Sequence, residues 1–265
     1  MSAFLLLWRE ALLDALRRKL VAAIAAASLL SLLVLNSCTS CVPAIQVNGA
    51  PQGSASTTTL VGMVLMIVVG LWVVTLAGLL GSDHLTQSLE DGHATSALAR
   101  PVRRHEFAFA RLAGALSVGL AAGLLLLGAT SFWLTTRSGL PAEPAALAVL
   151  ACLLSCVTVA ALAMTASLAL PRLAVWLLVF GLVFITSLAT GVSLAVPAEP
   201  GALTLLVAID RFGPPIASAM LRALAPWLPG ATLPADFAAV FARSTLWAAL
   251  GLASLAAAFR RIELR

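Results

Sequence analysis

Few side chains in this chain have the types and spacing that catalysis or metal binding requires. Glu90 and His93 would share one face of a helix, as two ligands of a metal ion can. No second pair at helical spacing completes a ligand set, so we expect a solvated helix face here and no metal ion. No paired aspartates or activated serine occur in the apolar segments, which disfavours an intramembrane protease, and no catalytic residue is predicted.

Nucleotide hydrolysis by this chain is also disfavoured. A phosphate-binding loop needs a lysine after its last glycine, so that the ammonium group reaches the β and γ phosphates. The single lysine of the sequence is Lys19, in Arg-Arg-Lys-Leu, and no glycine precedes it there. We therefore expect no cofactor bound by this chain, and any ATPase must be another polypeptide.

The four cysteines form two pairs along the sequence. Cys38 and Cys41 fall in a predicted outward-facing loop, where they could form a disulfide or remain two ordinary thiols. A redox role has less support, because no strand-to-helix turn carries them. Cys152 and Cys156 lie four residues apart in an apolar run and are expected to be small packing residues.

The composition indicates that much of this chain is surrounded by lipid. The 265 residues are 61% hydrophobic and 10% charged, so the chain cannot cover itself with polar surface. In lipid every backbone polar group must be paired internally. Continuous apolar runs at 60–80 and 145–170 are long enough to cross the bilayer as helices and lack the alternation of barrel strands. The net charge of +5 lacks the clustering and aromatic interleaving typical of nucleic-acid binding.

The sequence therefore predicts an all-α membrane protein with six transmembrane helices in a single domain. The spans are expected at about residues 20–35, 60–80, 107–134, 145–170, 173–196 and 237–259. An amphipathic helix over 2–19, with Leu5, Trp8, Leu12 and Ala15 on its apolar face, should lie on the membrane surface. The stretch that ends at Cys38 also resembles a signal peptide or lipidation site, but we expect it to be a retained span.

Two further segments have distinctive patterns. Residues 197–236 are interrupted by prolines, so we predict extracytoplasmic interfacial or re-entrant helices over 203–209 and 216–227. In the third span, the Gly119-x-x-x-Gly123 spacing would let a neighbouring helix approach closely.

The basic residues predict the orientation. With the N-terminus in the cytoplasm, twelve of the sixteen fall in inner segments, as the positive-inside rule requires. Both termini and residues 81–106 are then cytoplasmic. The inner set is Arg9, Arg17, Arg18, Lys19, Arg100, Arg103, Arg104, Arg111, Arg172, Arg260, Arg261 and Arg265, and the outer set is Arg137, Arg211, Arg222 and Arg243.

The polar stretch from Ser88 to Phe107 resembles the segment after the second span in permease subunits of type-2 ABC transporters. The layout of a surface helix, six spans and a broken outer segment before the last span is similar as well. Two positions depart from the pattern: His93 stands where a hydroxyl residue is usual, and Arg111 where lysine is usual. The matching residues are Glu90, Gly92, Leu98, Arg100, Pro101, Val102, Arg103, Arg104 and Glu106.

The resemblance implies a coupling helix, here about 83–99, that fits a groove of an ATPase subunit and transmits its closure to the spans. It further implies two copies of this chain with two ATPase subunits, ATP and Mg²⁺ in those partners, and a bacterial cytoplasmic (inner) membrane. The residues expected to contact the ATPase are His84, Gln87, Glu90, Asp91, Gly92, His93, Leu98, Arg100, Pro101, Arg103 and Arg104.

Several readings of the function stay open at this stage. The complex could export a substrate, or it could pass mechanical work to an extracytoplasmic accessory protein without moving solute. An ion-coupled carrier has less support, because the apolar runs hold almost no ionisable residue. The exceptions, Arg111 and Arg243, lie near span ends, where their side chains are expected to reach the headgroups. The substrate, the identity of the ATPase, and the choice between a homodimer and a heterodimer do not follow from the sequence.

Overall fold

The computed structural model describes residues 3–17, 46–47, 50–51, 54–90, 104–195, 204–228 and 230–261, and this part of the chain is almost entirely helical. Two-residue strands, β1 (Gln46–Val47) and β2 (Ala50–Pro51), pair antiparallel within the predicted loop before the second span. The helices are α1 (Ala3–Arg17), α3 (Ser54–Glu90), α5 (Arg104–Ser138), α6 (Ala142–Ala166), α7 (Arg172–Ala195), α8 (Thr204–Phe212), α9 (Ile216–Leu224) and α10 (Phe237–Arg261), with a 3-10 turn, η1 (Ala225–Trp227), after α9.

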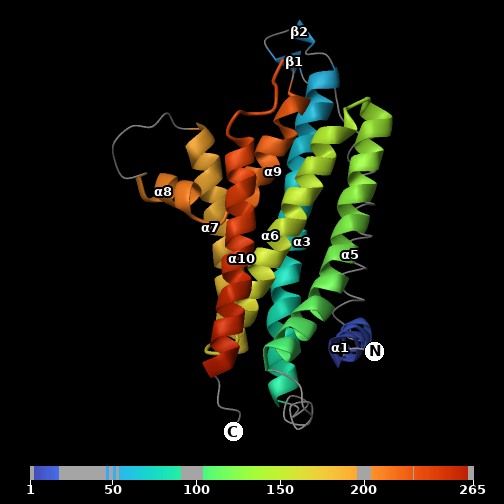
Figure 1. The fold of residues 1–265 in the computed structure, drawn as a ribbon. Coiled ribbons are helices and arrows are strands. Elements are labelled where there is room, and N and C mark those ends of the chain that lie inside the picture. Colours follow the sequence, from blue (N-terminus) through green and yellow to red (C-terminus); the bar gives the residue numbers. More distant parts are fainter. Residues whose placement is uncertain are drawn as a thin grey trace.

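Five of the described helices are long and apolar enough to cross a membrane. They correspond to the second to sixth predicted spans, and the first, at 20–35, lies outside the described residues. The helices run side by side, with α1 and the C-terminal end of α10 at the same end of the bundle (Figure 1). We call this the α1 end and the opposite end the α9 end. The spanning segments are Thr59–Asp83, Glu106–Thr136, Ala142–Ala166, Arg172–Ser193 and Phe237–Arg260.

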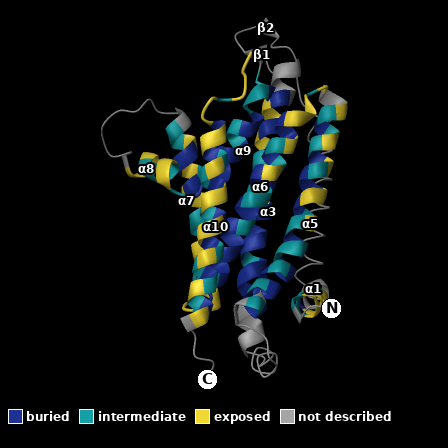
Figure 2. Ribbon diagram, viewed as in Figure 1, coloured by how far each residue is buried: buried dark blue, intermediate teal, exposed yellow. Residues whose placement is uncertain are grey.

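Helix α6 is the most buried of these spans and contacts α3, α5, α7, α9 and α10. Its sequence explains this position, because most of its buried side chains are small and let neighbouring helices approach closely. Prolines set where it begins: Pro141 precedes the helix and Pro144 lies in its first turn, where no backbone N–H is needed. Figure 2 shows buried residues gathered along α6, α3 and α9, and exposed ones on the outward side of α10.

The two glycines singled out in the third span both face α3. A Cβ at Gly119 would lie 3.4 Å from the Ala77 Cβ, and one at Gly123 would lie 2.7 Å from Val73 Cγ1. The absence of side chains at these positions therefore permits the close contact between α5 and α3. The buried Cys152 and Cys156 of α6 lie in the same core, and the Cys152 thiol contacts the Gly70 carbonyl oxygen at 3.5 Å.

Residues 81–90, which follow the predicted second span, continue the same helix. Helix α3 extends without a break for 37 residues and includes the first part of the predicted coupling segment. Gly81 does not end the helix, because it serves close packing: a Cβ there would lie 3.0 Å from the Ala160 carbonyl oxygen of α6. Leu85, Gln87 and Glu90 are favourable helix formers, so nothing in this stretch opposes continuation.

The two short helices predicted in the proline-rich segment are present, but their environments differ. Most of α9 is buried against α6, including Ile216 and Met220, whereas α8 contacts mainly α7 and leaves Leu205 largely exposed. The Trp227 indole N–H donates to the Pro141 carbonyl oxygen at 3.0 Å, which ties η1 to the start of α6. Helix α9 is therefore an internal part of the bundle, and α8 lies at its side (Figure 1).

Helix α1, the predicted surface helix, packs against α5. Ala11 is fully buried, and the Trp8 indole N–H donates to the Ser117 hydroxyl of α5 at 3.0 Å. Leu5, on the predicted apolar face, is 44% exposed. Gly114 of α5 leaves room for the α1 backbone at Ala11, so Ala11 and Trp8 define the contact with α5.

We predict that Gly114→Val weakens the contact between α1 and α5. A Cβ at Gly114 would lie 2.6 Å from the Ala11 Cβ, so the two helices must separate, at a cost of about 1–3 kcal/mol. Thermal unfolding in detergent should show a lower midpoint. The matched control is Gly128→Val in the same helix, where no atom lies within 4 Å of the added Cβ. Equal destabilisation by both variants would contradict this packing.

Candidate functional site

The predicted coupling residues fall partly within α3. His84, Gln87 and Glu90 belong to its last turns, and Arg104 begins α5. The first part of the predicted coupling segment and the second span are thus one continuous helix, and a displacement at Glu90 reaches the core without crossing a loop. The other predicted contact residues lie outside the described part of the chain: Asp91, Gly92, His93, Leu98, Arg100, Pro101 and Arg103. Cys38 and Cys41 lie outside it as well.

A polar cluster joins α3 to α7 at the α1 end. The Arg172 guanidinium donates to the Asp83 carboxylate at 2.7 Å, and the Trp176 indole N–H donates to its other oxygen at 3.3 Å. Only 8% of the Asp83 side chain is exposed, against 58% of the Arg172 side chain. The Arg172 guanidinium also lies over the Trp176 ring, 4.9 Å from its centroid. Both oxygens of a nearly buried carboxylate are therefore satisfied by α7.

Local sequence explains why these groups meet. Asp83 lies two residues after Gly81, just past the apolar stretch of α3, and Arg172 follows Pro171 at the first position of α7. A carboxylate beside the N-terminus of α7 also interacts favourably with the positive end of that helix dipole. Sequence reasoning treated Asp83 and Arg172 separately, although opposite charges at the same predicted membrane face were a usable signal for the pairing.

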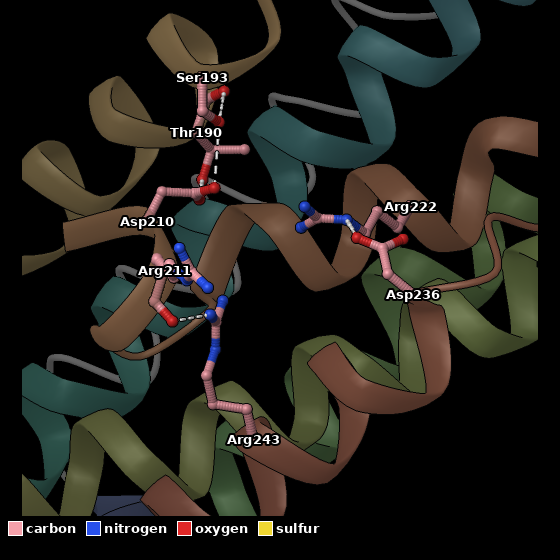
Figure 3. A network of polar contacts seen from close by, with 7 residues as sticks. All are labelled: Thr190, Ser193, Asp210, Arg211, Arg222, Asp236 and Arg243. Atoms are coloured by element: carbon pink, nitrogen blue, oxygen red, sulfur yellow. Dashed lines mark hydrogen bonds and ion pairs between the residues drawn. The ribbon is translucent and has the colours of Figure 1, made fainter. Parts of the chain in front are cut away.

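A second polar cluster holds α8 at the α9 end (Figure 3). The Asp210 carboxylate accepts hydrogen bonds from the Thr190 hydroxyl at 2.8 Å and the Ser193 hydroxyl at 3.0 Å, both from α7. The sequence analysis assigned Asp210 no role. Because both donors are hydroxyls, they satisfy the carboxylate oxygens without neutralising the charge.

Helix α10 binds the other side of α8. The Arg243 guanidinium donates through Nη1 to the Arg211 carbonyl oxygen, and the Trp247 indole N–H donates to the Phe212 carbonyl oxygen at 3.2 Å. These carbonyls end α8 and lack helical partners, so the two side chains act as a C-terminal cap. Close by, Arg222 pairs with Asp236 at 2.9 Å. Arg243, expected only to reach the headgroups from the span, is therefore a structural contact.

Arg111 also differs from its expected role at the end of a span. It is 9% exposed, and its guanidinium lies over the Phe107 ring, 5.4 Å from the centroid. The aromatic face therefore stabilises this cation within α5. In the described part of the chain, no three His, Cys, Asp or Glu side chains gather as metal ligands would.

The described helices define the class of the protein. Five of them have the length and apolar composition of membrane spans, which is typical of a multi-pass helical membrane protein. Comparison with protein-family models and with curated proteins finds no match for this chain.

The contacts of Asp83 predict a measurable coupling to Arg172. In a double-mutant cycle with Asp83→Asn and Arg172→Gln, we expect an interaction free energy of about 1–2 kcal/mol, because the carboxylate is nearly buried. Unfolding midpoints in detergent supply the four values.

The matched control is the more exposed pair of Arg222 and Asp236, in which 53% of the Asp236 side chain is exposed. A cycle with Arg222→Gln and Asp236→Asn should give less than about 1 kcal/mol. Additive effects of Asp83→Asn and Arg172→Gln would show that the two residues do not act together.

Proposed function

We propose that this chain is the permease subunit of a type-2 ABC transporter that works as an exporter. Two copies would pair in a bacterial cytoplasmic membrane, and two separate ATPase subunits would supply ATP hydrolysis. The observation that carries the proposal is the sequence from Ser88 to Phe107, which resembles the coupling segment of such permeases and joins α3 to α5.

Three features of the fold support this proposal. Helix α1 packs on α5 at the end of the bundle from which α3 leads into the coupling segment. The broken helices α8 and α9 precede the last span, as the resemblance implies. The long continuous α3 would carry a displacement from Glu90 into the bundle core.

The ion pair between Asp83 and Arg172 offers a route by which a displacement of α3 would reach a second span, α7. When an ATPase pair closes against the coupling segment, α3 would move, and its ion pair with Arg172 would pull the N-terminal end of α7 with it. Because Pro171 breaks the helical hydrogen bonding before α7, this end can shift without bending α6. Two spans would then move as a unit and change the exposure of a path between two copies.

The orientation belongs to the same proposal. The α1 end would face the cytoplasm and the α9 end the exterior, because most basic residues fall in segments at or leading to the α1 end. The partners would be the ATPase, a second copy of the chain and membrane lipid, with an extracytoplasmic accessory protein as a further partner if work is transmitted without solute.

The orientation predicts the behaviour of reporter fusions. Green fluorescent protein fused after Arg265 should fluoresce, and alkaline phosphatase inserted at Gly139, in the exposed turn between α5 and α6, should be active. Alkaline phosphatase folds only outside the cytoplasm, so its activity marks an outer position, whereas fluorescence marks a cytoplasmic one. The swapped fusions are the control, and activity of the phosphatase after Arg265 would overturn the orientation.

The ATPase association predicts the effect of changes in the coupling segment. The chain should co-purify with an ATPase that contains a phosphate-binding loop, and Glu90→Trp with Gly92→Trp should weaken this association on the order of tenfold or more. Glu143→Trp is the control, because Glu143 is exposed at the α9 end.

The outcome of activity measurements separates the alternatives. Stimulation of the ATPase by a transported compound favours export, and stimulation only by an extracytoplasmic protein favours mechanical transmission. Gradient-driven flux through the chain alone in liposomes, without nucleotide, would contradict the ABC proposal and favour an ion-coupled carrier.

A further inference from the structure

Three arginines lie at the α9 end, and they differ in how their charge is balanced. Arg222 forms an ion pair with Asp236 at 2.9 Å. Among the described residues, Arg211 and Arg243 pair with no carboxylate. The cluster therefore contains one balanced arginine and two whose positive charge no ion pair compensates.

The nearest acid, Asp210, forms no ion pair with either arginine. Its two oxygens accept hydroxyl hydrogen bonds from Thr190 and Ser193 of α7, at 2.8 and 3.0 Å (Figure 3). Figure 3 also shows the guanidinium groups of Arg211 and Arg243 turned toward one another. The carboxylates of Asp210 and Asp236 attract Arg243 only through space. An anion bound between the two guanidinium groups would reduce their mutual repulsion further.

Arg243 retains donor capacity at this place. Its Nη1 donates to the Arg211 carbonyl oxygen, while its Nε is buried and has no hydrogen-bond partner in the described part of the chain. A buried N–H without an acceptor is costly and rare in proteins. The Nη2 group of Arg243 has no such burial and forms no hydrogen bond with another described residue, so a phosphate could accept from it and from the exposed Arg211 together, as the fork of a guanidinium allows.

The surroundings of the pair are those of a membrane interface. Arg243 lies near the start of the span Phe237–Arg260, about 9 Å along the helix from Phe237 at 1.5 Å per residue. Phe212, at the end of α8 that contacts α10, is 71% exposed. An anionic group at this depth would therefore have an apolar side chain next to it that can contact a lipid tail.

We propose that Arg211 and Arg243 form a binding site for a phosphate group at the α9 end, carried by an anionic lipid headgroup or supplied as free phosphate. The site does not depend on the ATPase proposal, because it uses only contacts within α8 and α10. The bound oxyanion would hold α8 against α10 by neutralising both guanidinium groups.

The test is native mass spectrometry of the full chain titrated with phosphatidylglycerol, and separately with phosphatidylcholine, whose phosphate is balanced by a cation. We expect one phosphatidylglycerol to bind with roughly tenfold preference, and Arg211→Gln and Arg243→Gln each to weaken it by roughly tenfold. Arg222→Gln is the matched control: it removes one positive charge of the same cluster but no proposed phosphate contact, and it should weaken binding clearly less than either of the other two changes.

Inorganic phosphate distinguishes the two sources. Displacement of the lipid by millimolar phosphate identifies a free oxyanion as ligand, and no displacement identifies the headgroup. Because Arg243 also holds α8 in place, Arg243→Gln can weaken binding by loosening that helix. Arg211 is exposed, so Arg211→Gln should leave the unfolding midpoint unchanged, and its effect on binding is the decisive measurement. If Arg211→Gln binds both phosphatidylglycerol and phosphate as the wild type does, or if Arg222→Gln is equally impaired, the proposal fails.

Discussion

Close packing of small side chains around α6 is the constraint on which the bundle depends. In lipid, apolar side chains gain little by leaving their solvent, so helices associate through contact area and a few hydrogen bonds. Ala148, Ala151 and Cys152 leave the surface of α6 low enough for α3 and α9 to lie against it. Gly70 of α3 leaves room for α9 in the same way, because a Cβ there would overlap the side chain of Met220.

Among the described residues, the contacts that charged side chains make between helices lie at the two ends of the bundle, and they fix two helices whose apolar packing is limited. At the α1 end, Asp83 attaches the exposed start of α7 to α3. At the α9 end, Asp210 and Arg243 hold α8 between α7 and α10. The interior between them offers small and apolar contacts with little directional preference, so the ends fix the relative positions of the helices. In the proposed transporter, these ends are also where an ATPase and an outer ligand would act.

Much of the fold could be predicted because span length, proline positions and glycine spacing are local properties of the sequence. The described spans and the two short helices before α10 were found in this way. The continuation of α3 to Glu90 was not predicted, since the apolar run ends at Leu80 and hydropathy alone does not show where the helix ends. The pairing of Asp83 with Arg172 was missed because 89 residues separate the partners along the chain.

The sequence by itself determined that the chain is helical and membrane-spanning, because hydropathy and the need to pair every backbone group in lipid leave no other arrangement. It also determined which segment resembles a coupling element. Only the tertiary structure decided that α9 lies inside the bundle while α8 lies beside it, and that Arg211 and Arg243 turn toward each other while Arg222 is paired. Those choices depend on distances between helices, which are set by side-chain volumes on several elements at once and have no signature within any one segment.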